Sequence, residues 1–271
     1  MTATSTPAGT PSSTTTIRKT DIYNDPTFNY AQFWTGRDYE HNAEVIALRH
    51  LLRGCRFGHA VDIGGGFGRL SIILTEYADR VTLVDPSTQQ LELSERIFPG
   101  HSFVERKLMD AAHLDFADES VDLVTLIRVL HHLPDPGAEF RELSRILRPG
   151  GIAVIEVANS VHVANRIKHL MRGQRISRLP VDLRTPEARE SGSAPYFNHH
   201  PQTIRYDLSA VGLDVLEVLS VSNLRHPLAK AVIPERAMLA VERAAQRRLA
   251  RFYFGPSAFF LLRKRGTSPA A

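Results

Sequence analysis

The sequence of 271 residues predicts a doubly wound α/β fold built on a seven-stranded, mostly parallel sheet. Between residues 60 and 158, segments rich in aliphatic and β-branched residues alternate with segments whose apolar residues have helical spacing. This alternation is typical of βαβ units and therefore of a parallel sheet. The composition, 43% hydrophobic and 23% charged, is that of an ordinary globular protein.

The elements follow one another in a regular order. We expect strands at 59–66, 81–87, 101–111, 121–129 and 151–159, and two more after an interruption, at 211–223 and 256–265. Amphipathic helices are expected at 68–78, 87–97, 136–147, 201–210 and 234–252. The third of these helices ends in Arg-Pro-Gly-Gly, a sequence that stops a helix.

The flanking segments differ from this core in composition. Residues 1–16 are almost entirely Thr, Ser, Pro, Ala and Gly, which predicts a disordered tail, and a second tail is expected at 266–271. We expect an N-terminal helical lid at residues 17–59, because its segment 30–52 opens with aromatic side chains and continues as an amphipathic helix. Residues 60–265 then form the main domain. Its insertion at 160–206, predicted to be a helix followed by a polar loop, is expected to shape a substrate site.

A glycine-rich turn is the sharpest local signal. Asp62 precedes four glycines, Gly64, Gly65, Gly66 and Gly68, directly after an apolar strand and before a helix. Glycine permits positive φ and lets a ligand lie against the backbone, so the turn is expected to bind a nucleotide-like molecule. The dinucleotide fingerprint G-x-G-x-x-G does not fit, because Arg69 stands where its third glycine belongs.

The spacing D-x-G-x-G-x-G instead resembles motif I of the class I S-adenosylmethionine-dependent methyltransferases. The resemblance covers residues 60–158 and is closest to the branch that contains ubiquinone and menaquinone biosynthesis methyltransferases. It implies a Rossmann-like methyltransferase domain whose last strand is antiparallel. It also implies S-adenosylmethionine as the cofactor and S-adenosylhomocysteine as the product.

The resemblance assigns a part of the cofactor to each strand end. The glycine turn would support the methionine portion, with Arg128 at the same end. Asp85 and the adjoining Pro86 would meet the ribose, whose hydroxyls can donate to the carboxylate. Asp110 and Ala111 would lie beside the adenine amino group. Other roles stay open: Asp62 as an acceptor of local backbone hydrogen bonds, and Asp85 and Asp110 as caps of the following helix or turn.

Histidines are the candidate catalytic and substrate-binding groups. His131 and His132 follow the fourth strand and are candidate general bases, of which only one is expected to face the pocket. The alternative is that one of them packs in the core and the other orients a loop. Tyr196, His199 and His200 in the insertion are candidate substrate contacts, and the alternative is that they only stabilise the loop. We expect no metal site, because adjacent histidines point in different directions and no carboxylate is close in sequence.

Aromatic residues before the core are candidates for closing over the cofactor. Trp34 is expected to cover it, and Arg37 to pair with its carboxylate. Tyr30, Phe33 and Tyr39 would join them. The alternative is that these aromatic residues pack in the core.

The methyl acceptor is expected to be a small molecule bound in an apolar pocket, with an oxygen, nitrogen or carbon nucleophile. The [DNS]-P-P-[YF] signature of enzymes that methylate base or glutamine amines is replaced by IRVLHH, and the single Cys55 lies ahead of the first strand. Nucleic acid is therefore not favoured. RNA or protein acceptors remain an alternative, because residues 225–265 carry ten Lys or Arg against two acids. A non-catalytic cofactor-binding protein is the other alternative.

Location and assembly are less constrained by the sequence. The first residues lack the basic start and apolar stretch of a secretory signal, and no run of 18 apolar residues occurs, so a cytoplasmic protein without a transmembrane segment is expected. A monomer and a homodimer are both compatible with the sequence.

Overall fold

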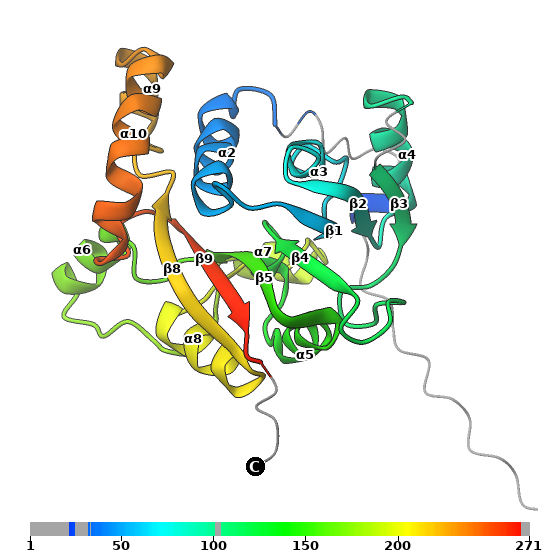
Figure 1. The fold of residues 1–271 in the computed structure, drawn as a ribbon. Helices are drawn as coiled ribbons and strands as arrows, with labels where there is room; N and C mark the ends of the chain where they lie inside the picture. The colour runs from blue at the N-terminus through cyan, green and yellow to red at the C-terminus, as the bar shows by residue number, and fades with distance from the viewer. Residues whose placement is uncertain (1–21, 25–31, 33, 101–103, 267–271) are drawn as a thin grey trace, which may run out of the picture.

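The computed structural model describes residues 22–24, 32, 34–100 and 104–266 (Figure 1). Its centre is a seven-stranded sheet in the order β3-β2-β1-β4-β5-β9-β8. The strands are β1 (Phe57–Ile63), β2 (Ala78–Asp85), β3 (Val104–Leu108), β4 (Val121–Leu126), β5 (Leu147–Ala158), β8 (Leu213–Val221) and β9 (Ser257–Lys264). Strand β9 is antiparallel to β5 and β8, whereas β1 to β5 pair in parallel, which confirms the predicted fold.

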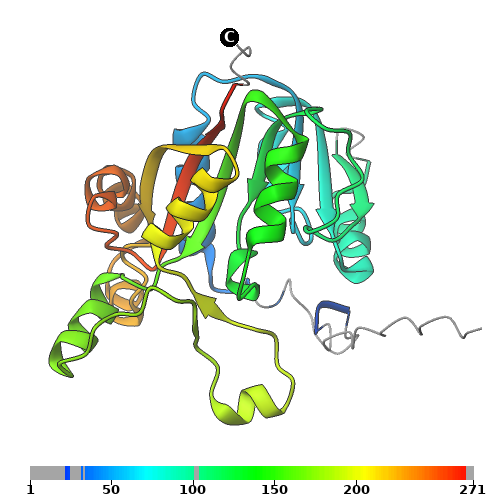
Figure 2. The same cartoon turned by 90° about the horizontal axis from the view of Figure 1, so that it is seen from below.

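Helices cover both faces of the sheet (Figures 1 and 2). One layer contains α2 (Asp38–Leu51), α3 (Ser71–Leu74), α4 (Thr88–Ile97) and α10 (Glu235–Ala250), and the other contains α5 (Gly137–Ile146) and α8 (Pro201–Ala210). Because successive residues of a strand point to opposite faces, Phe259 and Phe260 of β9 enter the two separate apolar cores.

The strand order places a crevice at one edge of the sheet. From β1 the chain proceeds outward through β2 to β3, and it then returns to β4 on the other side of β1. The loops that follow β1 and β4 therefore diverge, and ligands of open α/β sheets bind in the crevice at such a point.

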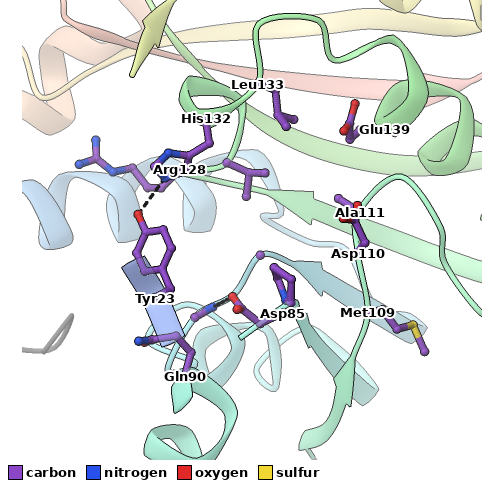
Figure 3. Close-up of a pocket in the computed structure, with 14 residues that line it drawn as sticks. Tyr23, Asp85, Gln90, Met109, Asp110, Ala111, Arg128, His132, Leu133 and Glu139 are labelled. Atoms are coloured by element: carbon purple, nitrogen blue, oxygen red, sulfur yellow. Dashed lines mark hydrogen bonds between the residues drawn. The ribbon is translucent and has the colours of Figure 1, made fainter. Parts of the chain in front are cut away.

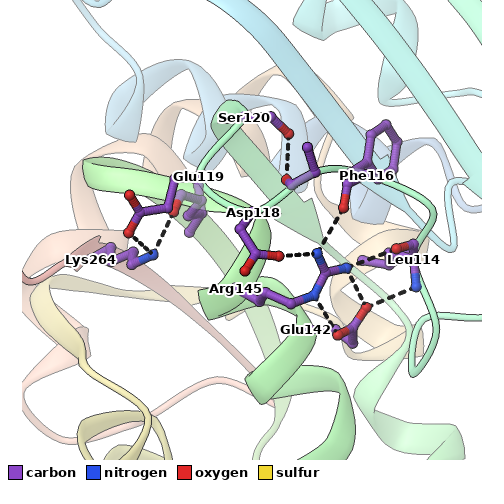
Figure 4. A network of polar contacts seen from close by, with 10 residues as sticks. Leu114, Phe116, Asp118, Glu119, Ser120, Glu142, Arg145 and Lys264 are labelled. Carbon is purple, nitrogen blue, oxygen red and sulfur yellow. Dashed lines mark hydrogen bonds and ion pairs between the residues drawn. The ribbon is translucent and has the colours of Figure 1, made fainter.

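The loop that follows β3 is fastened to α5 by one arginine (Figure 4). Arg145 donates to the carbonyl oxygens of Leu114 and Phe116, at 2.8 and 2.7 Å, and pairs with Asp118 and Glu142. The hydrogen bonds from Arg145 lower the pKa of Glu142 to about 2. This network holds the loop that carries Asp110 and Ala111.

The structure differs from the expected elements in three places. The helix predicted at 68–78 is reduced to Ser71–Leu74, because Gly68 has a φ of +89° before it and β2 already begins at Ala78. A short helix, α9 (Pro227–Val232), was not predicted. The insertion contains the expected helix, α6 (Val163–Met171), but the segment expected as a polar loop also contains α7 (Pro186–Glu190) and a two-stranded sheet of β6 (Val181–Asp182) and β7 (Phe197–Asn198).

The predicted N-terminal lid divides into separate parts. A 3-10 turn, η1 (Ile22–Asn24), lies against the start of α4, where Ser87 Oγ donates to the carbonyl oxygen of Tyr23. Helix α2 instead packs on the sheet and on α10, with Tyr39 donating to Glu242. The predicted tail 1–16, residues 267–271 of the second tail, and Tyr30 and Phe33 lie outside the described residues. None of the helices in the described residues is long and apolar enough to cross a bilayer.

Candidate active site

The buried carboxylate of Asp62 supports the glycine turn that follows β1. Asp62 is 2% exposed and accepts hydrogen bonds from Ser71 Oγ and Thr125 Oγ1, both at 2.6 Å. Burial raises the pKa of Asp62, and the two hydroxyl hydrogen bonds oppose that shift. A Cβ on Gly65 would lie 2.8 Å from Asp62 Oδ2, so the carboxylate and the turn are fitted to each other.

Position 64 favours glycine both because its backbone has a positive φ and because there is no room for a Cβ. Its φ is +66°, and a Cβ there would collide with Cγ2 of Val129. We expect Gly64→Ala to reduce the free energy of unfolding by about 1–3 kcal/mol through overpacking. Gly54→Ala is the matched control, because Gly54 also has a positive φ, +75°, but nothing within 4 Å of its Cβ position. Urea unfolding of the two variants separates the effect of the clash with Val129 from the cost of placing alanine at a positive φ. Equal losses of unfolding free energy in the two variants would contradict a clash at Gly64.

A pocket of about 220 Å³ opens at the carboxyl ends of β1 to β4 (Figure 3). Its walls combine backbone of the glycine turn with polar and apolar side chains from the loops after each strand. The lining residues are Tyr23, Gly64, Gly66, Asp85, Pro86, Gln90, Met109, Asp110, Ala111, Arg128, Val129, His132, Leu133 and Glu139.

Asp85 links the glycine turn to the start of α4. Its Oδ2 accepts a hydrogen bond from the Gly66 N–H at 2.8 Å, and its Oδ1 accepts one from the Ser87 N–H at 2.9 Å. Ser87 itself is the N-cap of α4, where its side chain accepts from the Gln90 N–H. The Asp85 carboxylate is thereby held in one orientation at the pocket wall.

Two polar side chains of the pocket contain buried atoms with no hydrogen-bond partner among the described residues. They are both amide atoms of Gln90, a residue only 1% exposed, and Oε2 of Glu139. Burial raises the pKa of Glu139, and Asp110 and Asp135 add to that shift. A buried polar group without a partner costs about 1–3 kcal/mol, so these atoms favour a pocket that holds a polar ligand.

His132 has a defined tautomer at the opposite wall. Its Nδ1 lies 2.9 Å from the carbonyl oxygen of Pro195, and its Nε2 lies 2.8 Å from the Tyr23 hydroxyl. A carbonyl oxygen can only accept, so Nδ1 carries the hydrogen. Burial lowers the pKa of His132, which keeps the ring neutral, and Nε2 then accepts from the Tyr23 hydroxyl. The lone pair of a neutral imidazole is thus directed at the pocket.

His131 does not line the pocket. It is 7% exposed, and its ring lies 4.0 Å from that of His132 and 5.0 Å from that of Tyr196, measured between centroids. Burial lowers the pKa of His131 well below its ordinary value. Its surroundings are those of a packing residue, and of the two histidines only His132 reaches the pocket.

A buried charged group lies beside the pocket. Glu44, 1% exposed, pairs with Arg69 at 2.5 Å, and its Oε1 lies 3.9 Å from Nε of Arg128. The Arg69 guanidinium stacks 3.7 Å above the ring centre of Trp34. Arg128 itself has a φ of +65°, which is unusual for a residue other than glycine and is a strain often found at functional sites.

Residues 61–155 match the sequence family described as a methyltransferase domain, and this range holds the glycine turn, Asp85, Asp110 and His132. The chain therefore contains a methyltransferase domain, in agreement with the resemblance to the class I S-adenosylmethionine-dependent methyltransferases. It is 28% identical to the methyltransferase GfsG of Streptomyces halstedii over 183 residues, which are 65% of this chain and 60% of that protein. It is 33% identical to a ubiquinone/menaquinone biosynthesis C-methyltransferase of Rubrivivax gelatinosus over 93 residues, 34% of this chain and 36% of that protein. In both cases the chain spans less than two thirds of the relative's length.

Solved methyltransferase structures share the fold. A methyltransferase in complex with the Trm112 activator of Haloferax volcanii has a TM-score of 0.60 at 21% identity, covering 92% of this chain and all of that chain. The 1,6-didemethyltoxoflavin-N1-methyltransferase of Burkholderia thailandensis, with S-adenosylhomocysteine bound, has a TM-score of 0.54 at 16% identity, covering 87% and 83%. At these identities the similarity is one of fold.

The pocket brings together most residues predicted to bind the cofactor. Those that line it are Gly64, Gly66, Asp85, Pro86, Asp110, Ala111 and Arg128. Asp62 and Gly65 line only a smaller cavity of about 20 Å³ beside Arg69 and Arg128, and Gly68 shapes the turn behind the pocket.

Trp34 and Arg37 are not among the residues that line the pocket. Trp34 is 8% exposed beneath Arg69, because the cation attracts the face of its ring. Arg37 is half-buried, and its pKa is lowered by burial and by the nearby Arg225 and Arg128. The structure therefore does not bring either side chain to the pocket, in contrast to the expectation that they close over the cofactor.

The three predicted substrate contacts of the insertion are not among the residues that line the pocket. His199 is 2% exposed and its Nε2 donates to the carbonyl oxygen of Leu130 at 2.9 Å. His200 is the N-cap of α8, with Nδ1 accepting from the Gln202 N–H. Tyr196 packs against His131. His199 and Tyr196 thus contact the loop after β4, whereas His200 contacts α8. No group of metal-ligating residues occurs in the described part of the chain.

Sequence reasoning missed six lining residues, namely Tyr23, Gln90, Met109, Val129, Leu133 and Glu139. Met109, Val129 and Leu133 adjoin predicted residues and could have been found by extending each strand end by one position. Gln90 lies in the first turn of the predicted helix 87–97, where its backbone N–H donates to the N-cap residue Ser87. Tyr23 is far from the glycine turn in sequence, and no local pattern indicates it.

Proposed function

We propose that this methyltransferase transfers a methyl group from S-adenosylmethionine to a hydroxyl-type nucleophile of a small molecule. The observation that carries the proposal is that one pocket joins the strand ends expected to hold the cofactor with a neutral histidine nitrogen. The cofactor is S-adenosylmethionine, the acceptor is a hydroxyl group, and the base is His132.

The pocket residues fit the chemical groups of the cofactor. Asp85 would accept from the ribose hydroxyls, and Asp110 and Ala111 would meet the purine. The side-chain amide of Gln90, which has no hydrogen-bond partner among the described residues, would gain hydrogen bonds from the same ligand. Arg128 and the backbone of Gly64 would hold the amino-acid portion. When bound, S-adenosylmethionine supplies a methyl group already activated by its sulfonium charge, so the chain need only align an acceptor and exclude water.

His132 supports an acceptor that loses a proton. As the acceptor oxygen bonds to the methyl carbon, its proton passes to His132 Nε2, and the carbon–sulfur bond breaks to leave S-adenosylhomocysteine. The Pro195 carbonyl that accepts from Nδ1 keeps the ring oriented and stabilises the positive charge it acquires. The acceptor hydroxyl would take the position at Nε2 that the Tyr23 hydroxyl has in this structure.

Apolar lining supports a small acceptor. Met109, Ala111, Val129 and Leu133 surround the polar groups of the pocket, as is usual for sites that enclose small molecules. Relatives named for quinone methylation agree with this class, among them a demethylmenaquinone methyltransferase of Clavibacter sepedonicus. A solved [4+2]-cyclase has the same fold, with a TM-score of 0.56 at 18% identity, covering 83% of this chain and 82% of that chain. Methyl transfer must therefore be measured directly.

We expect Asp85→Ala to weaken binding of S-adenosylmethionine and S-adenosylhomocysteine by about 1–3 kcal/mol, because hydrogen bonds to a charged acceptor are lost. Titration calorimetry measures the effect. Asp79→Ala is the matched control, since Asp79 is an exposed carboxylate at the start of the same strand. If Asp85→Ala leaves the affinity for both ligands unchanged, Asp85 does not bind the ribose. Binding of NADH in place of either ligand would contradict the assignment of S-adenosylmethionine as the cofactor.

Transfer itself is tested with S-adenosylmethionine labelled in its methyl group. The full chain is incubated separately with a small-molecule extract, total RNA and total protein, and label is followed in each fraction. The proposal expects label in the small-molecule fraction. Label only in RNA or protein would favour those acceptors, and binding without transfer to any fraction would favour a non-catalytic role.

A further inference from the structure

Helix α6 projects from the domain and buries none of its residues (Figure 2). Ile167, Leu170 and Met171 are 53%, 81% and 82% exposed. They are three and four positions apart, so they form one apolar stripe along the helix. Leu179, in the segment that follows, is 73% exposed. Aliphatic side chains this exposed on a projecting element indicate an interaction surface.

The same segment is strongly basic. Residues 163–181 contain Arg166, Lys168, Arg172, Arg175 and Arg178 and no acidic residue. All five basic residues are exposed. The apolar stripe therefore lies within a concentrated positive charge, the pattern of a helix that rests in the interface of a membrane.

We propose that α6 and the segment to Val181, which we name the basic arm, dock on the surface of an anionic phospholipid membrane. The aliphatic side chains would enter the boundary between headgroups and acyl chains, while the arginines and the lysine contact lipid phosphates. The helix is too short to cross a bilayer, so this is a surface contact.

Other occupants fit the basic arm less well. A second copy of the chain would bring ten positive charges together, five from each arm, without an acid in either arm to offset them. Single-stranded nucleic acid is usually bound by aromatic stacking platforms, and residues 163–181 contain no Phe, Tyr or Trp. An anionic bilayer matches both the charge and the aliphatic chemistry.

The place of the basic arm gives the contact a consequence for the pocket. The chain leaves the end of β5 at Ala158, forms the arm, and returns through Pro195, whose carbonyl oxygen holds His132. Both ends of the insertion thus lie at the edge of the sheet where the pocket opens. A membrane-bound arm would bring that pocket close to the bilayer. If the proposed function holds and its acceptor is apolar, the acceptor would be concentrated there.

Vesicle co-sedimentation of the full chain, without cofactor, tests the proposal. The probes are phosphatidylcholine vesicles with and without phosphatidylglycerol. We expect binding only to the anionic vesicles and weakening of that binding by salt. Absence of binding to the anionic vesicles, or equal binding to both kinds, would overturn the proposal.

Matched variants locate the surface. Leu170→Ser/Met171→Ser and Arg172→Glu/Arg175→Glu/Arg178→Glu should each weaken binding by about tenfold or more. The controls are Leu216→Ser/Val241→Ser, which removes exposed aliphatic residues elsewhere, and Arg243→Glu/Arg248→Glu/Arg251→Glu on and just after α10. Retained binding in the arm variants, or loss in the α10 variant instead, would overturn the assignment.

The outcome is separable from the proposed reaction. None of the substituted arm residues lines the pocket, so the arm variants should bind S-adenosylhomocysteine with unchanged affinity by calorimetry. A chain that binds vesicles but no cofactor would overturn the proposed function alone. Binding of the basic arm to RNA or to an acidic protein, without binding to the vesicles, would overturn the membrane assignment alone.

Discussion

His132→Ala is expected to lower kcat by about 10²–10⁴-fold while leaving the affinity for S-adenosylmethionine within a fewfold of its original value. The reason is the geometry of the ring. Its Nδ1 hydrogen is committed to the Pro195 carbonyl, and its Nε2 lone pair faces the pocket. Removing the imidazole therefore removes the acceptor for the proton of the substrate hydroxyl. Single-turnover kinetics with labelled cofactor, alongside calorimetry, separate chemistry from binding.

The pH dependence provides an independent measurement of the same group. Burial lowers the pKa of His132 below its ordinary value of 6.5, with Arg128 adding to the shift and the Pro195 hydrogen bond opposing it. A general base works in its deprotonated form, so kcat should be constant at neutral pH and above. It should fall only as the pH drops through this lowered pKa, and His132→Ala should lose that acid limb.

Two control variants distinguish the base from its neighbours. His131→Phe keeps an aromatic ring against Tyr196 and removes a histidine that does not line the pocket, so its kcat should change little. Tyr23→Phe removes the hydroxyl at Nε2, and because the acceptor is expected to take that position, the loss should stay below about tenfold. A loss in His131→Phe as large as that in His132→Ala would exclude His132 as the specific base.

The strand ends were predictable because they rest on local chemistry. A parallel sheet brings the residues after each strand to one edge, so Gly64, Asp85 and Asp110 could be placed in one pocket from their sequence positions alone. The choice between His131 and His132 could not be made in this way. It depends on the 3-10 turn η2 (Leu130–His132), which turns one ring toward the pocket and the other toward Tyr196.

Long-range contacts account for the residues that were misplaced. Trp34 and Arg37 were expected at the cofactor, but the cation that lies on the Trp34 ring belongs to Arg69, 35 positions later. His199 was expected at the substrate, but its Nε2 is 2.9 Å from the carbonyl oxygen of Leu130. Such partners are set by tertiary packing, and a single sequence does not record them. Tyr23 was missed for the same reason, since His132 is 109 positions away.

Glu44→Ala is expected to reduce the free energy of unfolding by about 3–5 kcal/mol. Glu44 is 1% exposed and faces two guanidinium groups, those of Arg69 at 2.5 Å and Arg128 at 3.9 Å. Both arginine side chains are largely buried, at 11% and 13% exposure. Without the carboxylate, two like charges would remain close together in a medium that solvates them poorly. The loss would therefore exceed that of a simple truncation.

Urea unfolding at 25 °C measures this loss, and Glu76→Ala is its control. Glu76 also pairs with an arginine, Arg49, but the two side chains are 45% and 50% exposed, so its removal should cost only about 0–1 kcal/mol. Equal losses in the two variants would contradict the importance of burial. Because Arg128 lines both the pocket and the smaller cavity beside it, Glu44→Ala should also weaken cofactor binding. Arg69→Met, which removes one of the two like charges, should recover part of the lost stability in the Glu44→Ala background, as expected if repulsion between the guanidinium groups causes the loss.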